Sequence, residues 1–93
     1  MPAFASERLT VAGTAVGLTS GTYAPASGPA VSAFLTVETD QIRFTLDGTT
    51  PTSSRGHLID AGGSLVLTGL EEIRAFRAIR VTNSAAVEVT YKR

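Results

Sequence analysis

Residues 31–47 read VSAFLTVETDQIRFTLD and contain two runs in which apolar and polar side chains alternate. The first run covers residues 31–38 and the second covers residues 42–47. A two-residue period places one kind of side chain on each face of a β-strand. Thr39 and Asp40 separate the runs, so the sequence predicts an antiparallel hairpin with one buried and one solvated face.

Similar short apolar runs recur along the rest of the chain, which is rich in Thr, Val, Ala and Gly. Nine Gly and four Pro interrupt these runs, and such punctuation is typical of an all-β domain. The β-branched residues fit a pleated strand better than a helix. The further predicted strands are residues 8–12, 14–18, 64–68, 75–82 and 86–91.

The segments between these strands are expected to be irregular. Residues 20–29 contain two prolines that lack backbone donors, and residues 49–63 form a long loop rich in Thr, Ser and Gly. Residues 70–73 fit a single helical turn or a bend. A helix over residues 71–80 is the alternative to the strand there, because part of its apolar spacing is helical.

The predicted fold class is all-β, a small antiparallel β-sandwich that is jelly-roll-like or a flattened barrel, with about six to eight short strands. The length of 93 residues accommodates one core, so residues 1–93 are expected to form a single domain. Residues 1–7 precede the first predicted strand and are expected to form a flexible N-terminal arm.

Charge and composition exclude several function classes. Eight Lys and Arg balance eight Asp and Glu, which argues against a non-specific nucleic-acid binder. The absence of cysteine excludes disulfides and thiolate metal sites. We expect no signal peptide, no membrane span and synthesis in the cytoplasm.

No grouping of residues predicts a catalytic or metal site. His57 is the only histidine, and no nucleophile or metal-ligand spacing surrounds it, so we interpret it as a loop residue. The spacing of Asp40, Asp47 and Asp60 matches no calcium loop, and Asp47 before Gly48 is typical of a turn. We therefore expect no enzyme activity, no cofactor and no metal.

Arginine supplies seven of the eight basic residues, which favours contacts with other proteins, because the planar guanidinium makes forked hydrogen bonds and stacks on rings. The basic cluster in residues 74–80 follows Glu71 and Glu72, and salt bridges to them are the alternative to an interface role. The candidate interface residues are Tyr23, Pro25, Pro51, His57, Arg74, Arg77 and Arg80.

The segment of residues 42–52, IRFTLDGTTPT, runs a strand into an Asp-Gly turn and a corner fixed by Pro51. It is followed, in order, by Gly-His at residues 56–57, a Gly-Gly turn, and an aromatic-Arg strand with the sequence FRAIR at residues 76–80. Over residues 35–91 this order resembles small virion proteins of tailed bacteriophages and prophages. The D-G-T-x-P-T turn is also similar to turns in β-sandwich accessory modules of carbohydrate-active enzymes.

The resemblance implies a structural, non-enzymatic protein of the virion. It would decorate the capsid or belong to a head spike, the head–tail junction or the tail. Its partners would be other virion proteins and copies of itself in a homo-oligomer, with a trimer favoured, and neither nucleic acid nor membrane. The alternative is a carbohydrate-binding or adhesive β-sandwich module, and a small enzyme or metal protein is a third hypothesis.

Overall fold

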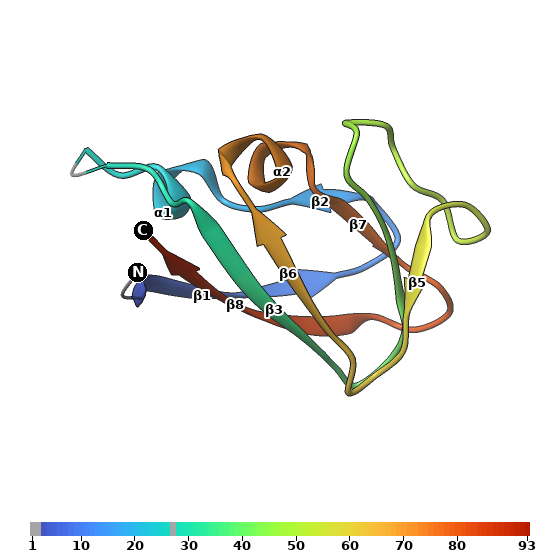
Figure 1. Cartoon of the computed structure of the whole chain (residues 1–93). Coiled ribbons are helices and arrows are strands. Elements are labelled where there is room, and N and C mark those ends of the chain that lie inside the picture. The colour runs from blue at the N-terminus through green and yellow to red at the C-terminus, as the bar shows by residue number, and fades with distance from the viewer. Residues whose placement is uncertain (1–2, 27) are drawn as a thin grey trace.

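Eight strands and two short helices are formed by residues 3–26 and 28–93, the part of the chain that the computed structural model describes (Figure 1). In chain order the elements are β1 (Ala3–Val11), β2 (Val16–Gly17), α1 (Ser20–Tyr23), β3 (Ser32–Glu38), β4 (Ile42–Thr45), β5 (His57–Ile59), β6 (Ser64–Thr68), α2 (Leu70–Ala75), β7 (Arg77–Arg80) and β8 (Ala85–Lys92).

The strands form two antiparallel sheets of four strands each. Sheet A has the order β1-β8-β3-β6, and sheet B has the order β2-β7-β4-β5. The chain passes from one sheet to the other between β1 and β2, between β3 and β4, between β5 and β6, and between β7 and β8. This is the strand order of an eight-stranded jelly roll. The predicted all-β sandwich is therefore confirmed, and the jelly-roll form describes it.

The predicted hairpin between residues 31–38 and 42–47 is wrong. β3 pairs with β6 and β8, whereas β4 pairs with β5 and β7 in the other sheet. Thr39, with φ of 72°, redirects the chain so that the two apolar faces meet across the core instead of lying side by side. The alternation correctly identified the buried face of each strand, but it does not specify which strands pair.

The core lies between the sheets and takes its side chains from alternate strand positions. On β3, Leu35 is 1% exposed, while its neighbour Phe34 on the outer face is 42% exposed. Val31 is 43% exposed although it shares the parity of Leu35, because it precedes β3. The largest fully buried side chains are Tyr91, Phe76, Leu35, Ile42, Leu67 and Ile73.

The N-terminal segment differs from the expectation, and the expected helical turn is present but two residues longer than residues 70–73. β1 starts at Ala3 and pairs with β8 along its length, so residues 3–7 are a strand and not an arm, and residues 1–2 lie outside the described residues. α2 extends to Ala75, and β7 starts only at Arg77, which excludes a helix over residues 71–80.

Two short elements lie within the predicted loops. α1 lies within residues 20–29, of which Ser27 is outside the described residues, and β5 lies within residues 49–63. β5 has only three residues, and it forms because it pairs with β4. Its local sequence therefore gives only a weak indication of a strand.

A polar contact joins β1, β8 and the segment before α1. The carboxylate of Glu7 accepts hydrogen bonds from the Tyr91 hydroxyl, from the Thr19 hydroxyl at 2.6 Å and from the Thr19 amide at 3.2 Å. Within residues 3–26 and 28–93, every buried side-chain polar atom has a hydrogen-bond partner, and neither helix is long and apolar enough to cross a membrane.

Candidate functional site

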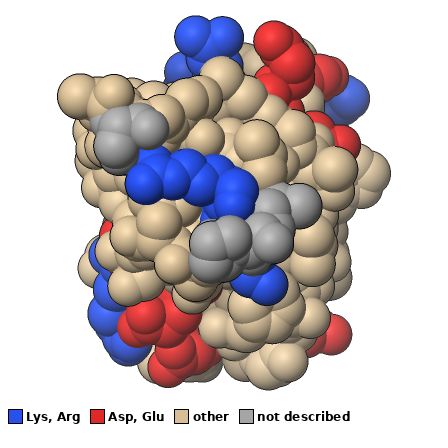
Figure 2. All heavy atoms as spheres, turned by 60° about the vertical axis from the view of Figure 1, so that its left-hand side comes forward, with Lys and Arg blue, Asp and Glu red and all other residues tan. Residues whose placement is uncertain are grey.

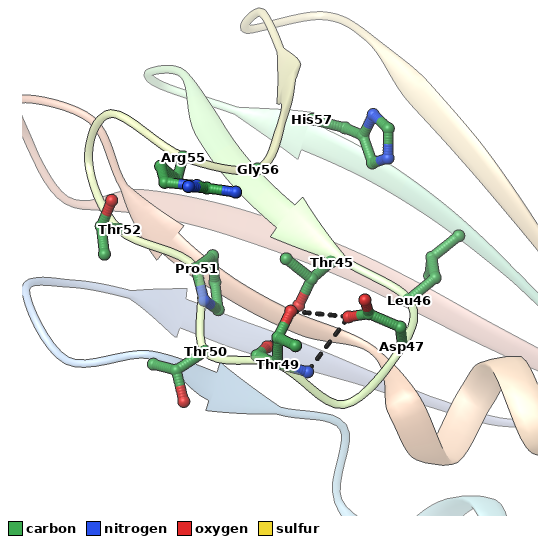
Figure 3. Close-up of a pocket in the computed structure, with 10 residues that line it drawn as sticks. All are labelled: Thr45, Leu46, Asp47, Thr49, Thr50, Pro51, Thr52, Arg55, Gly56 and His57. Atoms are coloured by element: carbon green, nitrogen blue, oxygen red, sulfur yellow. Dashed lines mark hydrogen bonds between the residues drawn. The ribbon is translucent and has the colours of Figure 1, made fainter.

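A hollow of about 690 Å³ lies at the end of the sandwich where β4 leaves sheet B. Its wall is formed by the last residue of β4, the following loop and the first residue of β5 (Figure 3). The lining residues are Thr45, Leu46, Asp47, Thr49, Thr50, Pro51, Thr52, Arg55, Gly56 and His57.

Asp47 fixes the first half of this loop, as its position before Gly48 predicts. Its Oδ1 accepts the Thr49 amide at 3.1 Å and the Thr49 hydroxyl at 2.6 Å (Figure 3). Hydrogen bonds from Thr49 to the charged form, with a smaller contribution from His57, hold the pKa of Asp47 below its ordinary value. Gly48 has φ of 84°, a conformation that glycine adopts readily.

Arg43 fixes the second half of the loop from the outer face of β4. Its Nε donates to the carbonyl of Ser53 at 3.1 Å, and its NH1 donates to the carbonyl of Gly56 at 3.0 Å. Gly56 has φ of 125°, and a Cβ there would meet the Phe44 carbonyl oxygen at 3.1 Å. Arg43 and the absence of a side chain at Gly56 thus hold the loop against β4.

The hollow combines two basic side chains with several threonine hydroxyls. Arg55 and His57 are exposed and lie around the same hollow as Asp47 and Thr49 (Figure 3). The His57 ring packs 5.4 Å from the Phe44 ring, centroid to centroid. This set can donate and accept hydrogen bonds to a polar ligand or to a polar segment of another protein. Within the described part of the chain, no three His, Asp or Glu side chains gather in a metal-binding group.

The structure distributes the seven candidate interface residues over three places. Pro51 and His57 lie in the hollow, where Pro51 is buried and His57 is exposed at the start of β5, not in a loop. Tyr23 and Pro25 lie in and after α1, at the other end of the sandwich (Figure 1). The three arginines lie on α2 and β7.

The end that carries Tyr23 and Pro25 also carries both termini. Tyr23 is only 9% exposed and packs on Tyr91 with ring centroids 6.1 Å apart, so it belongs to the core at this end. Arg93 donates to the Gly28 carbonyl at 2.9 Å and stacks 4.1 Å from the Phe4 ring centroid. Figure 2 shows this end as mostly uncharged, with basic groups near its centre and acidic groups towards its margins.

Arg74, Arg77 and Arg80 are all exposed, but they do not form one cluster. Arg74 lies on α2, whereas Arg77 and Arg80 lie at the two ends of β7. None of the three makes an ion pair with a described residue, so the alternative of salt bridges to Glu71 and Glu72 is wrong. Glu72 instead accepts the Thr68 amide at 2.8 Å. Arg80 also lines a second hollow of about 410 Å³, together with Thr52 and Ser53.

Sequence reasoning missed Arg43 and Arg55. The outward parity of Arg43 on the alternating residues 42–47 was visible, but its partners depend on the loop folding back over β4. Arg55 follows the turn in which Thr52 and Arg55 exchange backbone hydrogen bonds of 3.0 and 3.2 Å, and this turn has no strong sequence signature.

Comparisons with known proteins identify no relative of this chain. No family model matches it, no curated protein matches it, and no solved structure matches it.

Proposed function

We propose that this chain is a structural protein of tailed bacteriophage or prophage particles. It docks on the head shell, on a head spike or on a tail-associated assembly as repeated copies, and it carries out no chemical step. It acts by binding other virion proteins and copies of itself through its folded surface. It acts in the virion after synthesis in the host.

The strand order of the two sheets is the observation that carries this proposal. The orders β1-β8-β3-β6 and β2-β7-β4-β5 describe a jelly roll, an architecture that viral capsid domains share with lectins and cupins. The turn of residues 47–52, one part of the order of segments that resembles phage virion proteins, forms part of the wall of the main hollow. One fold serves several functions. Whether the chain is present in purified phage particles therefore decides whether it has the proposed function.

The loop of residues 46–56 supports a docking role because it is held in place before any partner arrives. Asp47 and Arg43 bind it from within the chain through side-chain hydrogen bonds. A surface that is already ordered loses less conformational entropy on association than a mobile one. The small domain in turn gains stability when it is bound, by mass action.

Particle composition tests the proposal. Particles from the phage or induced prophage that carries the gene are purified by density gradient, washed in high salt and analysed by quantitative mass spectrometry. We expect the chain in repeated copies per particle, at a fixed ratio to the major capsid protein. A chain that is abundant in the lysate but absent from washed particles would overturn the proposal.

A carbohydrate-binding function is the second candidate, and the main hollow favours it. Threonine hydroxyls, the Arg55 guanidinium and the Asp47 carboxylate surround a volume of about 690 Å³, and such groups suit the hydroxyls of a sugar. A glycan array with the intact chain tests this function. Binding that is lost in Arg55→Ala and kept in Arg77→Ala would support it, and an array without hits would exclude it.

A further inference from the structure

β6 is an edge strand of sheet A, and no other strand within residues 3–26 and 28–93 covers its second side (Figure 1). The Val37 amide donates to the Gly63 carbonyl at 2.9 Å, and the Gly69 amide donates to the Val31 carbonyl at 2.7 Å. In an antiparallel ladder, alternate residues bond to the same neighbour. The odd-numbered positions of β6 therefore bond to β3, and Ser64, Val66 and Thr68 direct their backbone groups to the open edge.

One of these edge groups is already occupied. The Thr68 amide donates to Oε1 of Glu72, which reaches back from α2. The register leaves the amides of Ser64 and Val66, and the carbonyls of the edge residues, directed away from β3. An open strand edge of this kind is a template for pairing with another strand.

The outer face beside this edge is uncharged and has apolar side chains at its centre. Phe34 and Val66 are cross-strand neighbours, and they are 42% and 59% exposed. The strand Ser64–Thr68 and its flanking Gly63 and Gly69 carry no charge. The opposite edge of the same sheet differs, because β1 carries Glu7 and Arg8, and Arg8 forms ion pairs with Glu38 and Glu88. Charged side chains along the β1 edge protect it from pairing, whereas the charge that reaches the β6 edge is the Glu72 carboxylate at Thr68, at the end of the strand.

We propose that β6 pairs antiparallel with β6 of a second copy of this chain, about a twofold axis at Val66. The two Val66 residues exchange both backbone hydrogen bonds, and each Ser64 amide donates to the Thr68 carbonyl of the other copy. The Thr68 amide exchanges its bond to Glu72 for one to the Ser64 carbonyl of the other copy. Sheet A continues into the second copy without a break.

A second copy fits this edge because the edge is complementary to itself. The axis places Val66 opposite Val66, with Phe34 one strand further on each side, so the exposed apolar side chains form one continuous row. No like charges face each other across the strands, and the chain has a net charge of zero, so no long-range repulsion opposes the approach.

The association is weak because the shared strand is short. Five residues of strand span about 17 Å, which buries much less than the roughly 800 Å² per partner of a standard interface. We expect a dissociation constant of about 0.1–1 mM. A twofold contact closes with two copies, so it differs from the trimer expected from the sequence. This inference does not depend on the proposed virion role.

Sedimentation velocity between about 10 µM and 1 mM tests the pairing. We expect the mass to rise from 9.6 kDa towards twice that value. Val66→Lys and Val66→Glu should each weaken the dimer at least about fivefold, and an equal mixture of the two variants should restore it. The matched control is Thr10→Lys, which adds the same charge on the exposed outer face of β1 and should leave the dimer intact.

Several outcomes would overturn this inference. They are a constant mass of 9.6 kDa, a threefold mass, growth without limit, or a dimer that the Val66 variants weaken no more than Thr10→Lys does. Circular dichroism checks that the variants fold. If they do not, amide exchange of the unmodified chain decides: protection of Ser64 and Val66 must rise with concentration. A dimer that is absent from particles would contradict only the proposed virion role.

Discussion

The hydroxyl of Tyr91 donates a hydrogen bond to Oε2 of Glu7, which joins strands β8 and β1 across 84 residues of sequence. Burial is the main cause that raises the pKa of Tyr91 well above its ordinary value, and the bond to Glu7 adds to it. The folded chain therefore holds this phenol proton more tightly than the unfolded chain does.

The pH dependence of stability follows from this difference. Tyrosine in an unfolded chain titrates near pH 10. The contribution of Tyr91 is complete below about pH 10 and is lost as the pH rises above it, because the unfolded state then releases a proton that the folded state keeps. We expect the free energy of unfolding, measured with urea, to fall steadily above about pH 10.

Tyr91→Phe should change this behaviour in two ways. At neutral pH the lost hydrogen bond should lower the free energy of unfolding by about 0.5–1.5 kcal/mol. Above pH 10 the variant should lose less stability than the unmodified chain. Tyr23→Phe is the matched control, since it removes the chain's other tyrosine hydroxyl and should keep the alkaline loss that Tyr91 causes. Equal alkaline slopes for Tyr91→Phe and the unmodified chain would contradict this assignment.

Arg43→Met should loosen the loop of residues 46–56 while the sandwich stays folded. Met retains most of the aliphatic length but cannot donate to the carbonyls of Ser53 and Gly56. Limited trypsin digestion at native pH, followed by mass spectrometry, should show cleavage after Arg55 at least about threefold faster. Arg77→Met is the control, because Arg77 is exposed on β7 and its side chain makes no hydrogen bond to the described residues of this loop. An unchanged rate in Arg43→Met would show that Arg43 does not hold the loop.

Gly56→Ala should destabilise the fold more than Gly48→Ala. Both glycines have positive φ, so each substitution carries a conformational cost of about 1–2 kcal/mol. Only at Gly56 does the new Cβ also meet backbone, the Phe44 carbonyl oxygen at 3.1 Å, whereas nothing lies within 4 Å at Gly48. Urea unfolding measures both variants, and a Gly48 variant that is as unstable as the Gly56 variant would contradict this reason.

The alternation of residues 31–47 predicted the all-β class and the buried face of β3 and β4 because each strand lies between core and solvent. It did not predict their partners, because two apolar faces are equally buried side by side or across a sandwich. The turn at Asp47 was predictable from two neighbouring residues. The anchoring of the loop by Arg43 was not, because it depends on where a distant segment returns.

Two neighbouring residues of β3 test directly which side chains of this strand point into the core and which point outward. Both the described core and the proposed pairing at β6 depend on this orientation. Leu35 is 1% exposed inside the sandwich, and Phe34 is 42% exposed on the outer face. Leu35→Ala removes buried methyl groups and leaves a cavity, so it should lower the free energy of unfolding by about 2–5 kcal/mol.

Phe34→Ala deletes the larger side chain, yet it should cost less than about 1 kcal/mol in dilute solution, because much of the ring is already in contact with water. Urea unfolding at about 5 µM keeps the chain monomeric for this comparison. If Phe34→Ala were the more damaging of the two, β3 would face the opposite way, and the outer face could not present Phe34 and Val66 to a second copy.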